Sequence, residues 1–150
     1  MPDTTLRWRD FAELTPRELY DVLRLRCAVF IVEQNCAYAD IDGNDPQARH
    51  LLAYLGPDFV GCLRLFTPEA AGSSARLGRI VVEPAHRAAG LGRVLMRTGL
   101  TEVRRLCGAV PVELSAQSHL ERFYAGLGFA RFTDDYLEDG IPHCDMRREA

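Results

Sequence analysis

The stretch RIVVEPAHRAAGLGRVLMRTGL, residues 79–100, decides the fold of this chain. A run of β-branched residues typical of a strand ends in Glu-Pro, and an apolar-periodic segment typical of a helix follows. Gly90 and Gly92 lie between them. A helix N-terminus exposes N–H groups and about half a positive charge, and glycine lets an anion approach this backbone closely. The stretch therefore predicts a phosphate or pyrophosphate site, with Arg87 and Arg93 adding charge at its rim.

The same glycines also fit a tight turn without a ligand. The interpretation as an anion site therefore depends on the predicted strand before the glycines and the predicted helix after them. The dinucleotide-binding fingerprint is excluded, because it requires GxGxxG after the first strand of a βαβ unit. Here the glycines follow several predicted strands and have a different spacing. A nucleotide- or phosphopeptide-binding module that uses this turn stays open as an alternative.

The composition is that of a globular protein with one domain, which we place at residues 1–150. The net charge of -3 gives no general attraction to nucleic acid or to an anionic membrane, and we expect neither as a partner. The sequence contains no apolar stretch of the roughly 20 residues that a membrane span needs, and no apolar leader. We therefore expect a cytoplasmic protein. All 18 basic residues are arginine, which excludes lysine chemistry such as a Schiff base.

Cysteine and histidine usage argues against disulfides and metal sites. The five cysteines are odd in number and include no CxxC pair, which favours free, mostly buried thiols in a cytosolic protein. The four histidines show no HExxH or comparable ligand spacing, so we expect no metal.

Periodicity and turn residues predict strands and helices that form a mixed α/β sheet with helices packed on it. A helix begins at Thr15-Pro16, because threonine is a good N-cap and proline suits the first helical position. The apolar faces of the two long helices are predicted as Leu19, Val22, Leu23, Cys27 and Phe30, and as Leu91, Val94, Leu95, Val103, Leu106 and Cys107. The expected strands are residues 6–11, 50–55, 59–66, 76–83, 110–116, 130–137 and 141–148. Two pairs of them are predicted to form hairpins, across Gly56-Pro57-Asp58 and across Glu138-Asp139-Gly140. A short helix is expected within residues 118–129, ending at Gly126 or Gly128.

Two stretches resemble successive motifs of one enzyme superfamily. RIVVEPAHRAAGLGRVLM (79–96) resembles motif A of the GCN5-related N-acetyltransferases, or GNATs, and AQSHLERFYAGLGF (116–129) resembles the motif that follows it. LRCAVFIVEQNCAYADIDGND (25–45) and YLEDGIPHCDM (136–146) are similar more narrowly to the ElaA-like branch. The resemblance implies the GNAT fold: an α/β fold with a mixed, mostly antiparallel central sheet of six to seven strands, helices on both faces, and a splay between strands four and five.

The resemblance implies acetyl-CoA as co-substrate. Its pyrophosphate is expected on the backbone N–H groups of Arg87, Ala88, Ala89, Gly90, Leu91, Gly92 and Arg93. The pantetheine arm is expected beside Ile80, Val81 and Val82, where the N–H near Val82 polarises the thioester carbonyl. Gln117 falls where relatives have an Asn or Asp that contacts the cofactor, and the longer side chain changes its reach.

The resemblance also implies an N-acetyltransferase that binds both substrates and lets a primary amine attack acetyl-CoA directly. Tyr124 matches the general acid that protonates the leaving thiolate; the alternative is an aromatic side chain packed in the core. Glu33 and His143 are candidate general bases, and the alternatives are a salt-bridged surface carboxylate and a structural histidine. A non-catalytic acyl-CoA-binding sensor or interaction module on the same fold is the alternative function.

The acceptor is expected to be a small molecule or a peptide with a primary amine. An acidic rim that favours a cationic amine would consist of Asp40, Asp42, Asp45, Glu33, Glu138 and Asp139. The alternative is that residues 39–46 are simply an Asp-rich turn. A homodimer is considered by analogy with the family, whose closing strands often pair between subunits.

Overall fold

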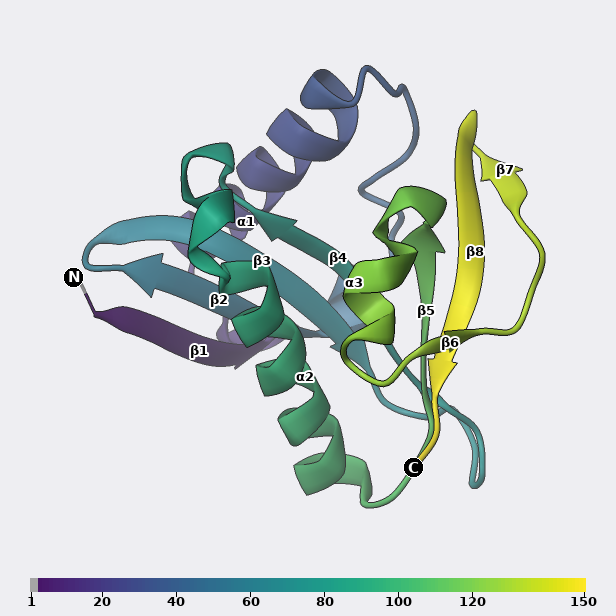
Figure 1. Ribbon diagram of the computed structural model, residues 1–150. Helices are drawn as coiled ribbons and strands as arrows, with labels where there is room; N and C mark the ends of the chain where they lie inside the picture. Colours follow the sequence, from purple (N-terminus) through teal and green to yellow (C-terminus); the bar gives the residue numbers. More distant parts are fainter. Residues whose placement is uncertain (1–2) are drawn as a thin grey trace.

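The computed structural model describes residues 3–150, which form an eight-stranded sheet with helices packed on it (Figure 1). The strands are β1 (Thr4–Asp10), β2 (Arg49–Leu55), β3 (Asp58–Phe66), β4 (Ala75–Val82), β5 (Val112–Gln117), β6 (Ala130–Arg131), β7 (Tyr136–Glu138) and β8 (Ile141–Arg148). They lie in the order β1-β2-β3-β4-β5-β8-β6, and β7 pairs with β8 outside that path. Only the pair β4–β5 is parallel among the described strands, so the mostly antiparallel sheet is confirmed.

The sheet has eight strands because the segment predicted as one strand at 130–137 is divided in two. The amide of Asp145 donates to the Thr133 hydroxyl at 2.9 Å, and residues 132–135 lie outside the strands on either side. β7 then turns into β8 through Asp139 and Gly140, whose φ angles of 51° and 78° are both positive. Two positive φ angles are what a two-residue hairpin turn requires, so the predicted hairpin is confirmed.

The helices are α1 (Pro16–Arg26), α2 (Leu91–Cys107) and α3 (Glu121–Ala125), and α1 continues as a π-helical segment, Cys27–Glu33. α1 begins where the sequence predicted. The Thr15 hydroxyl accepts from the amide of Glu18 at 3.1 Å, and the Glu18 carboxylate accepts from the amide of Thr15 at 3.0 Å. This capping box satisfies two amides that have no partner within the helix. Within residues 3–150, no helix combines the length and apolarity that a bilayer crossing requires.

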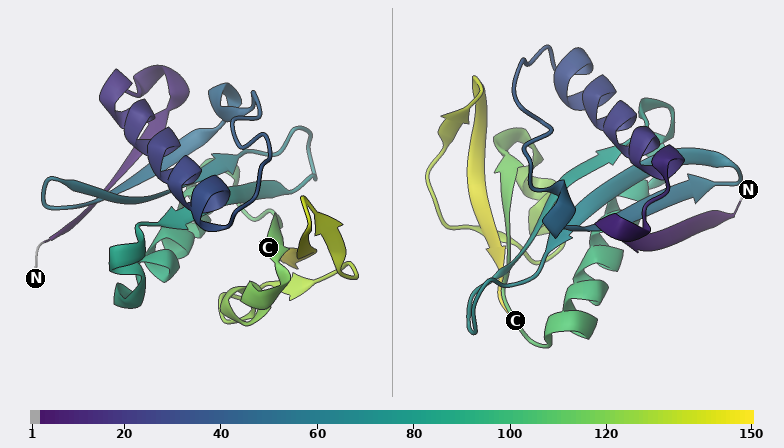
Figure 2. Two further views of the ribbon diagram at one scale, coloured as in Figure 1. Left: turned by 90° about the horizontal axis from the view of Figure 1, so that it is seen from above. Right: turned by 180° about the vertical axis from the view of Figure 1, so that it is seen from behind.

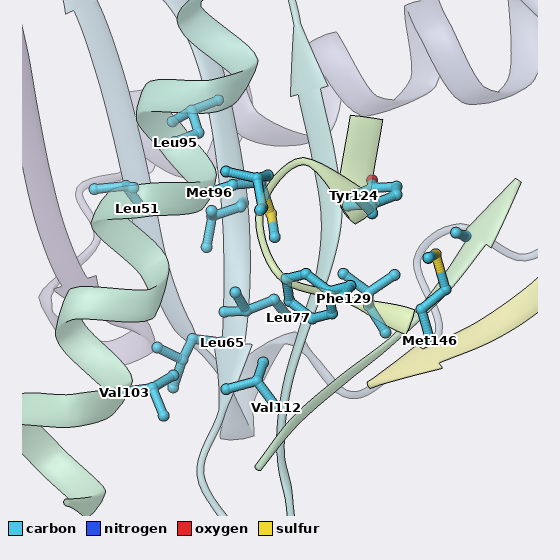
Figure 3. Close-up of a cluster of buried hydrophobic side chains, with 14 of the residues drawn as sticks. Leu51, Leu65, Leu77, Leu95, Met96, Val103, Val112, Tyr124, Phe129 and Met146 are labelled. Atoms are coloured by element: carbon cyan, nitrogen blue, oxygen red, sulfur yellow. The ribbon is translucent and has the colours of Figure 1, made fainter. Parts of the chain in front are cut away.

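The helices α1 and α2 cover opposite faces of the sheet, as predicted (Figure 2). Side chains of a strand alternate between faces, so Leu51 and Leu63 pack with α2 while Leu52 and Cys62 pack with α1. The cluster on the α2 side is the larger one and includes Phe129, which follows α3 (Figure 3).

The apolar faces of the long helices differ in part from the prediction. On α1 and the π-helical segment that continues it, Leu25 and Val29 are buried and Cys27 is exposed, because the buried positions follow Val22 at spacings of three and then four. On α2, the predicted Val94 and Leu106 are exposed, and Met96 is buried instead. All five cysteines are free, and the buried ones are Cys36, Cys62 and Cys144.

The parallel strands β4 and β5 stay together over a short distance. They pair at Ala75–Val112 and at Arg76–Glu113, and beyond these pairs they separate. The splay between the fourth and fifth strands is therefore confirmed. Each strand leaves backbone groups facing the opening, because a strand directs alternate N–H and C=O groups to each side.

A β-bulge in β4 lies beside this opening. Cys62 of β3 pairs with Val81, but Arg64 pairs with Gly78, so β4 contains one extra residue against β3. Within the bulge, Arg79 has a left-handed φ of 49°. Because a bulge bends its strand and increases the twist, it helps to turn β4 away from β5.

Candidate active site

A cleft of about 950 Å³ opens where β4 and β5 separate. Its walls come from both strands, the end of the π-helical segment and the loop after it, residues 119–120 with Tyr124 of α3, and the β7–β8 hairpin. The predicted site residues that line it are Glu33, Ile80, Val81, Val82, Arg87, Gln117, Tyr124 and His143. The other predicted cofactor residues, 88–93, lie outside this lining, in the turn that leads into α2.

The turn between β4 and α2 has a backbone suited to an anion. Gly90 adopts a left-handed φ of 75°, and the first bond of α2 runs from the amide of Val94 to the carbonyl of Gly90, at 3.3 Å. The amides of residues 91–93 therefore have no acceptor within the helix. An ideal Cβ at Gly90 would have no atom of the described residues within 4 Å, so the space beside the turn is open.

Arg87, at the entrance of this turn, forms a two-pronged ion pair with Glu33. Its Nη1 and Nη2 atoms lie 2.6 and 2.5 Å from the two carboxylate oxygens. This hydrogen bonding lowers the pKa of Glu33, which makes its carboxylate a weaker base. The geometry corresponds to the salt-bridged carboxylate that the sequence left open as the alternative to a general base.

Tyr124 lies on α3, and its side chain is buried in the core while also bordering the cleft. The ring packs edge-on against Phe123 and Phe129, with centroids 5.1 and 6.2 Å apart. Burial raises the pKa of Tyr124 to about 12, so the phenol is protonated at neutral pH. The side chain therefore packs in the core, as the second alternative has it, and it also borders the cleft, where its role as general acid stays a prediction.

His143 lies on β8, opposite Gln117 of β5 in the strand register. Its Nδ1 is 2.7 Å from the carbonyl oxygen of Ile141. A neutral imidazole that donates from Nδ1 has its lone pair on Nε2, and Nε2 lies 3.6 Å from the Glu138 carboxylate. The ring also stacks on Tyr136 with 6.1 Å between centroids, so the side chain is oriented from three directions.

The acidic rim predicted from residues 40–45 is wrong. Asp40 and Asp45 are buried, at 3% and 5% exposure, and both pair with the buried Arg26 at 2.9 and 2.8 Å. Arg64 completes the set, with Nη atoms 2.6 Å from Asp42 and 2.9 Å from Asp45. A carboxylate taken out of water needs a cation beside it, so these aspartates are neutralised inside the fold and do not attract an amine.

Arg79 links this arginine–aspartate network to the cleft. Its Nε lies 2.8 Å from an Asp40 oxygen, its guanidinium covers the Tyr38 ring at 5.6 Å, and both Arg79 and Tyr38 line the cleft. The Tyr38 hydroxyl donates to Asp40 at 2.8 Å. Across the described part of the chain, no group of three or more His, Cys, Asp or Glu side chains is arranged to hold a metal ion.

Comparison with known proteins decides the family. The family model described as "Acetyltransferase (GNAT) domain" matches residues 14–150. The chain belongs to the GNAT family. Protein ElaA of Escherichia coli is 40% identical over 148 residues, which cover 96% of this chain and 97% of that protein.

Solved structures agree with this membership. The crystal structure of Escherichia coli ElaA has a TM-score of 0.92 at 38% identity and covers 98% of this chain and 100% of its own. An acyl-CoA N-acyltransferase from Pseudomonas aeruginosa has a TM-score of 0.91 at 41% identity, covering 97% of this chain and 99% of its own. The GNAT fold and the ElaA-like resemblance are thus confirmed.

Sequence reasoning missed several residues that shape this GNAT cleft. Tyr38, Arg79 and Gln34 all line it, and the side-chain oxygen of Gln34 accepts a hydrogen bond from the side-chain nitrogen of Gln117 at 3.1 Å. One sequence signal pointed to the buried arginine–aspartate network beside the cleft. Arg64 interrupts an otherwise apolar strand, and a buried charge there needs a partner of opposite charge.

Proposed function

We propose that this GNAT protein transfers the acetyl group of acetyl-CoA to a primary amine, by direct attack while both substrates are bound. The observation that carries the proposal is the splay of β4 and β5, which pair at two positions and then leave a cleft of about 950 Å³ between them. An extended acyl carrier can pair with the backbone edge that the neighbouring strand has left. Bringing amine and thioester together there makes their reaction effectively intramolecular.

The carrier's position follows from the turn and from β4. The turn of residues 87–93 suits a diphosphate through the free amides of residues 91–93 and the Arg87 guanidinium, while Ile80, Val81 and Val82 form the strand edge for the pantetheine arm. The amide of Glu83 donates to the Val60 carbonyl of β3 at 2.8 Å. Because N–H groups alternate along a strand, the amide of Val82 points to the other side, toward the splay.

This direction supports Val82 as the donor to the thioester oxygen. A fixed donor at a developing oxyanion typically lowers the barrier by about 3 kcal/mol. Bound acetyl-CoA supplies the activated acetyl thioester. Gln117 faces the same opening from β5 and is the proposed side-chain contact to the carrier.

Two residues of the chain handle the protons. His143 is the proposed base: its Nε2 takes a proton from the amine nitrogen as that nitrogen bonds to the acetyl carbon. Tyr124 is the proposed acid: its phenol gives a proton to the sulfur as the carbon–sulfur bond breaks. We assign the base to His143 rather than Glu33, because Nδ1 of His143 lies 2.7 Å from the Ile141 carbonyl oxygen and this leaves Nε2 to accept a proton at the cleft.

A thiol-release assay tests the proposal. The purified protein is incubated with acetyl-CoA and a broad panel of small amines and peptides, and free CoA is measured against amine-free controls. Release that depends on an amine and falls in the Tyr124→Phe variant supports N-acetyl transfer. Acetyl-CoA binding without release above background, unchanged by Tyr124→Phe, would instead identify a non-catalytic sensor.

A further inference from the structure

Residues 33–36, which we call the strap, cross the cleft and contact three of its walls. Glu33 binds Arg87 at the turn before α2, and the Gln34 side chain accepts a hydrogen bond from that of Gln117 on β5 at 3.1 Å. The Cys36 thiol lies 3.5 Å from the Asp139 carbonyl, in the turn between β7 and β8. The strap therefore joins the cofactor side of the cleft to its far wall.

The base of the strap is fixed by the arginine–aspartate network. Arg26 directly precedes the π-helical segment and Asp40 follows the strap, and these two buried side chains pair at 2.9 Å. The chain from residue 27 to residue 39 is thus a loop closed at its base by one ion pair. Its outer contacts are weaker, because the ion pair of Glu33 is solvent-exposed, with 42% exposure of its side chain.

The strap has an irregular backbone. The amides of Gln34 and Cys36 donate to carbonyls five residues earlier, at 3.1 and 3.0 Å, which is the π-helical pattern. Asn35 between them has a left-handed φ of 49°. π-Helical turns are rare and are found mostly at functional sites.

Two of the three strap contacts use residues that the proposed function assigns to the acyl carrier, namely Arg87 and Gln117. A diphosphate and a carboxylate both prefer the paired N–H groups of a guanidinium, so they compete for the same edge of Arg87. We propose that Glu33 is a positioning residue that acts through Arg87: the carrier's diphosphate displaces it, the strap is released, and the acceptor side of the cleft opens only after the carrier has bound. This inference rests on the proposed function.

Calorimetry with acetyl-CoA tests the competition. The Glu33→Gln variant removes the competing charge, and because exposed ion pairs contribute about 0.2–1 kcal/mol, acetyl-CoA should bind about 1.4- to fivefold more tightly. Asp10→Asn is the matched control: it removes an exposed carboxylate that binds Arg49 at 2.9 Å at the end of β1, away from the cleft, and should leave affinity unchanged.

A double-mutant cycle separates displacement from a general charge effect. In the Arg87→Gln background, Glu33→Gln should no longer improve acetyl-CoA binding, because there is no guanidinium left to release. A gain of the same size in that background would overturn the proposal, as would weaker or unchanged binding of acetyl-CoA by Glu33→Gln alone.

Hydrogen exchange gives an independent readout of the strap. Adding CoA should speed exchange at the amides of Gln34, Asn35 and Cys36, while the amides of residues 90–93 become protected. Slower exchange at the strap would show that it closes over the carrier and would contradict the proposal. If the wild-type protein bound no CoA at all, the proposed function itself would fail, which is a distinguishable result.

Discussion

Replacing Gly90 by aspartate tests the anion turn with little effect on the rest of the fold. The φ of 75° at this position costs a residue with a side chain about 1 kcal/mol. A new Cβ has open space around it, with no described atom within 4 Å, so there is no steric cost in the carrier-free protein. We therefore expect Gly90→Asp to lower the free energy of unfolding by about 1 kcal/mol.

Gly90→Asp should weaken the binding of the acyl carrier by more than it lowers the stability of the fold. At a separation of about 6 Å, each phosphate charge would repel the new carboxylate by about 0.7–2.8 kcal/mol, for effective dielectric constants of 80 to 20. Two such charges should weaken CoA binding by about 1.4 kcal/mol or more, which is at least tenfold, as measured by calorimetry. Gly90→Ala is the control, because it shares the backbone strain without the charge. Unchanged CoA affinity in Gly90→Asp, or an equal loss in both variants, would refute the assignment of the diphosphate to this turn.

Further predictions concern the acid, the network and the thiols. Tyr124→Phe should reduce turnover about a hundredfold and leave acetyl-CoA affinity unchanged in calorimetry, since a general acid typically contributes 10²–10⁴-fold. Asp45→Asn should lower the free energy of unfolding by about 3 kcal/mol in urea titrations, because it removes a carboxylate that neutralises both Arg26 and Arg64 inside the fold. The hydrogen bond from Arg64 lowers the pKa of Asp42 in the folded state, so the stabilising contribution of Asp42 is complete above the unfolded pKa of about 3.9. This contribution is lost as the pH falls through the folded pKa. In Asp42→Asn, the free energy of unfolding should therefore decrease less between neutral and acid pH. In the native protein, the exposed Cys27 should react promptly with a thiol reagent and Cys62 should not, because burial raises the pKa of Cys62 to about 12; prompt labelling of Cys62 would contradict the described core.

Local chemistry made several features predictable from the sequence. Thr15-Pro16 starts α1, and Asp139-Gly140 turns β7 into β8, because capping side chains and positive φ angles act within a few residues. The turn at Gly90 is of the same kind. The splay between β4 and β5 came from family resemblance, since neither composition nor periodicity says where parallel strands part.

Contacts between distant segments could not be predicted in the same way. Glu33 and Arg87 are 54 positions apart, and their pairing depends on how α1 and the turn before α2 meet in space. The same holds for Arg26 and its aspartates, which lie on a loop that read as ordinary turn chemistry. The predicted helix face that included Cys27 failed for a related reason: Arg26 occupies the buried side of α1, because its partners lie there.

A crystal structure of the protein with bound CoA tests the central claim most directly. We predict the diphosphate on the turn of residues 87–93 and the pantetheine arm between β4 and β5, with Arg87 turned from Glu33 to a phosphate. CoA bound at any other surface, with the opening between these strands left vacant, would contradict the claim that the splay is the acyl-carrier site.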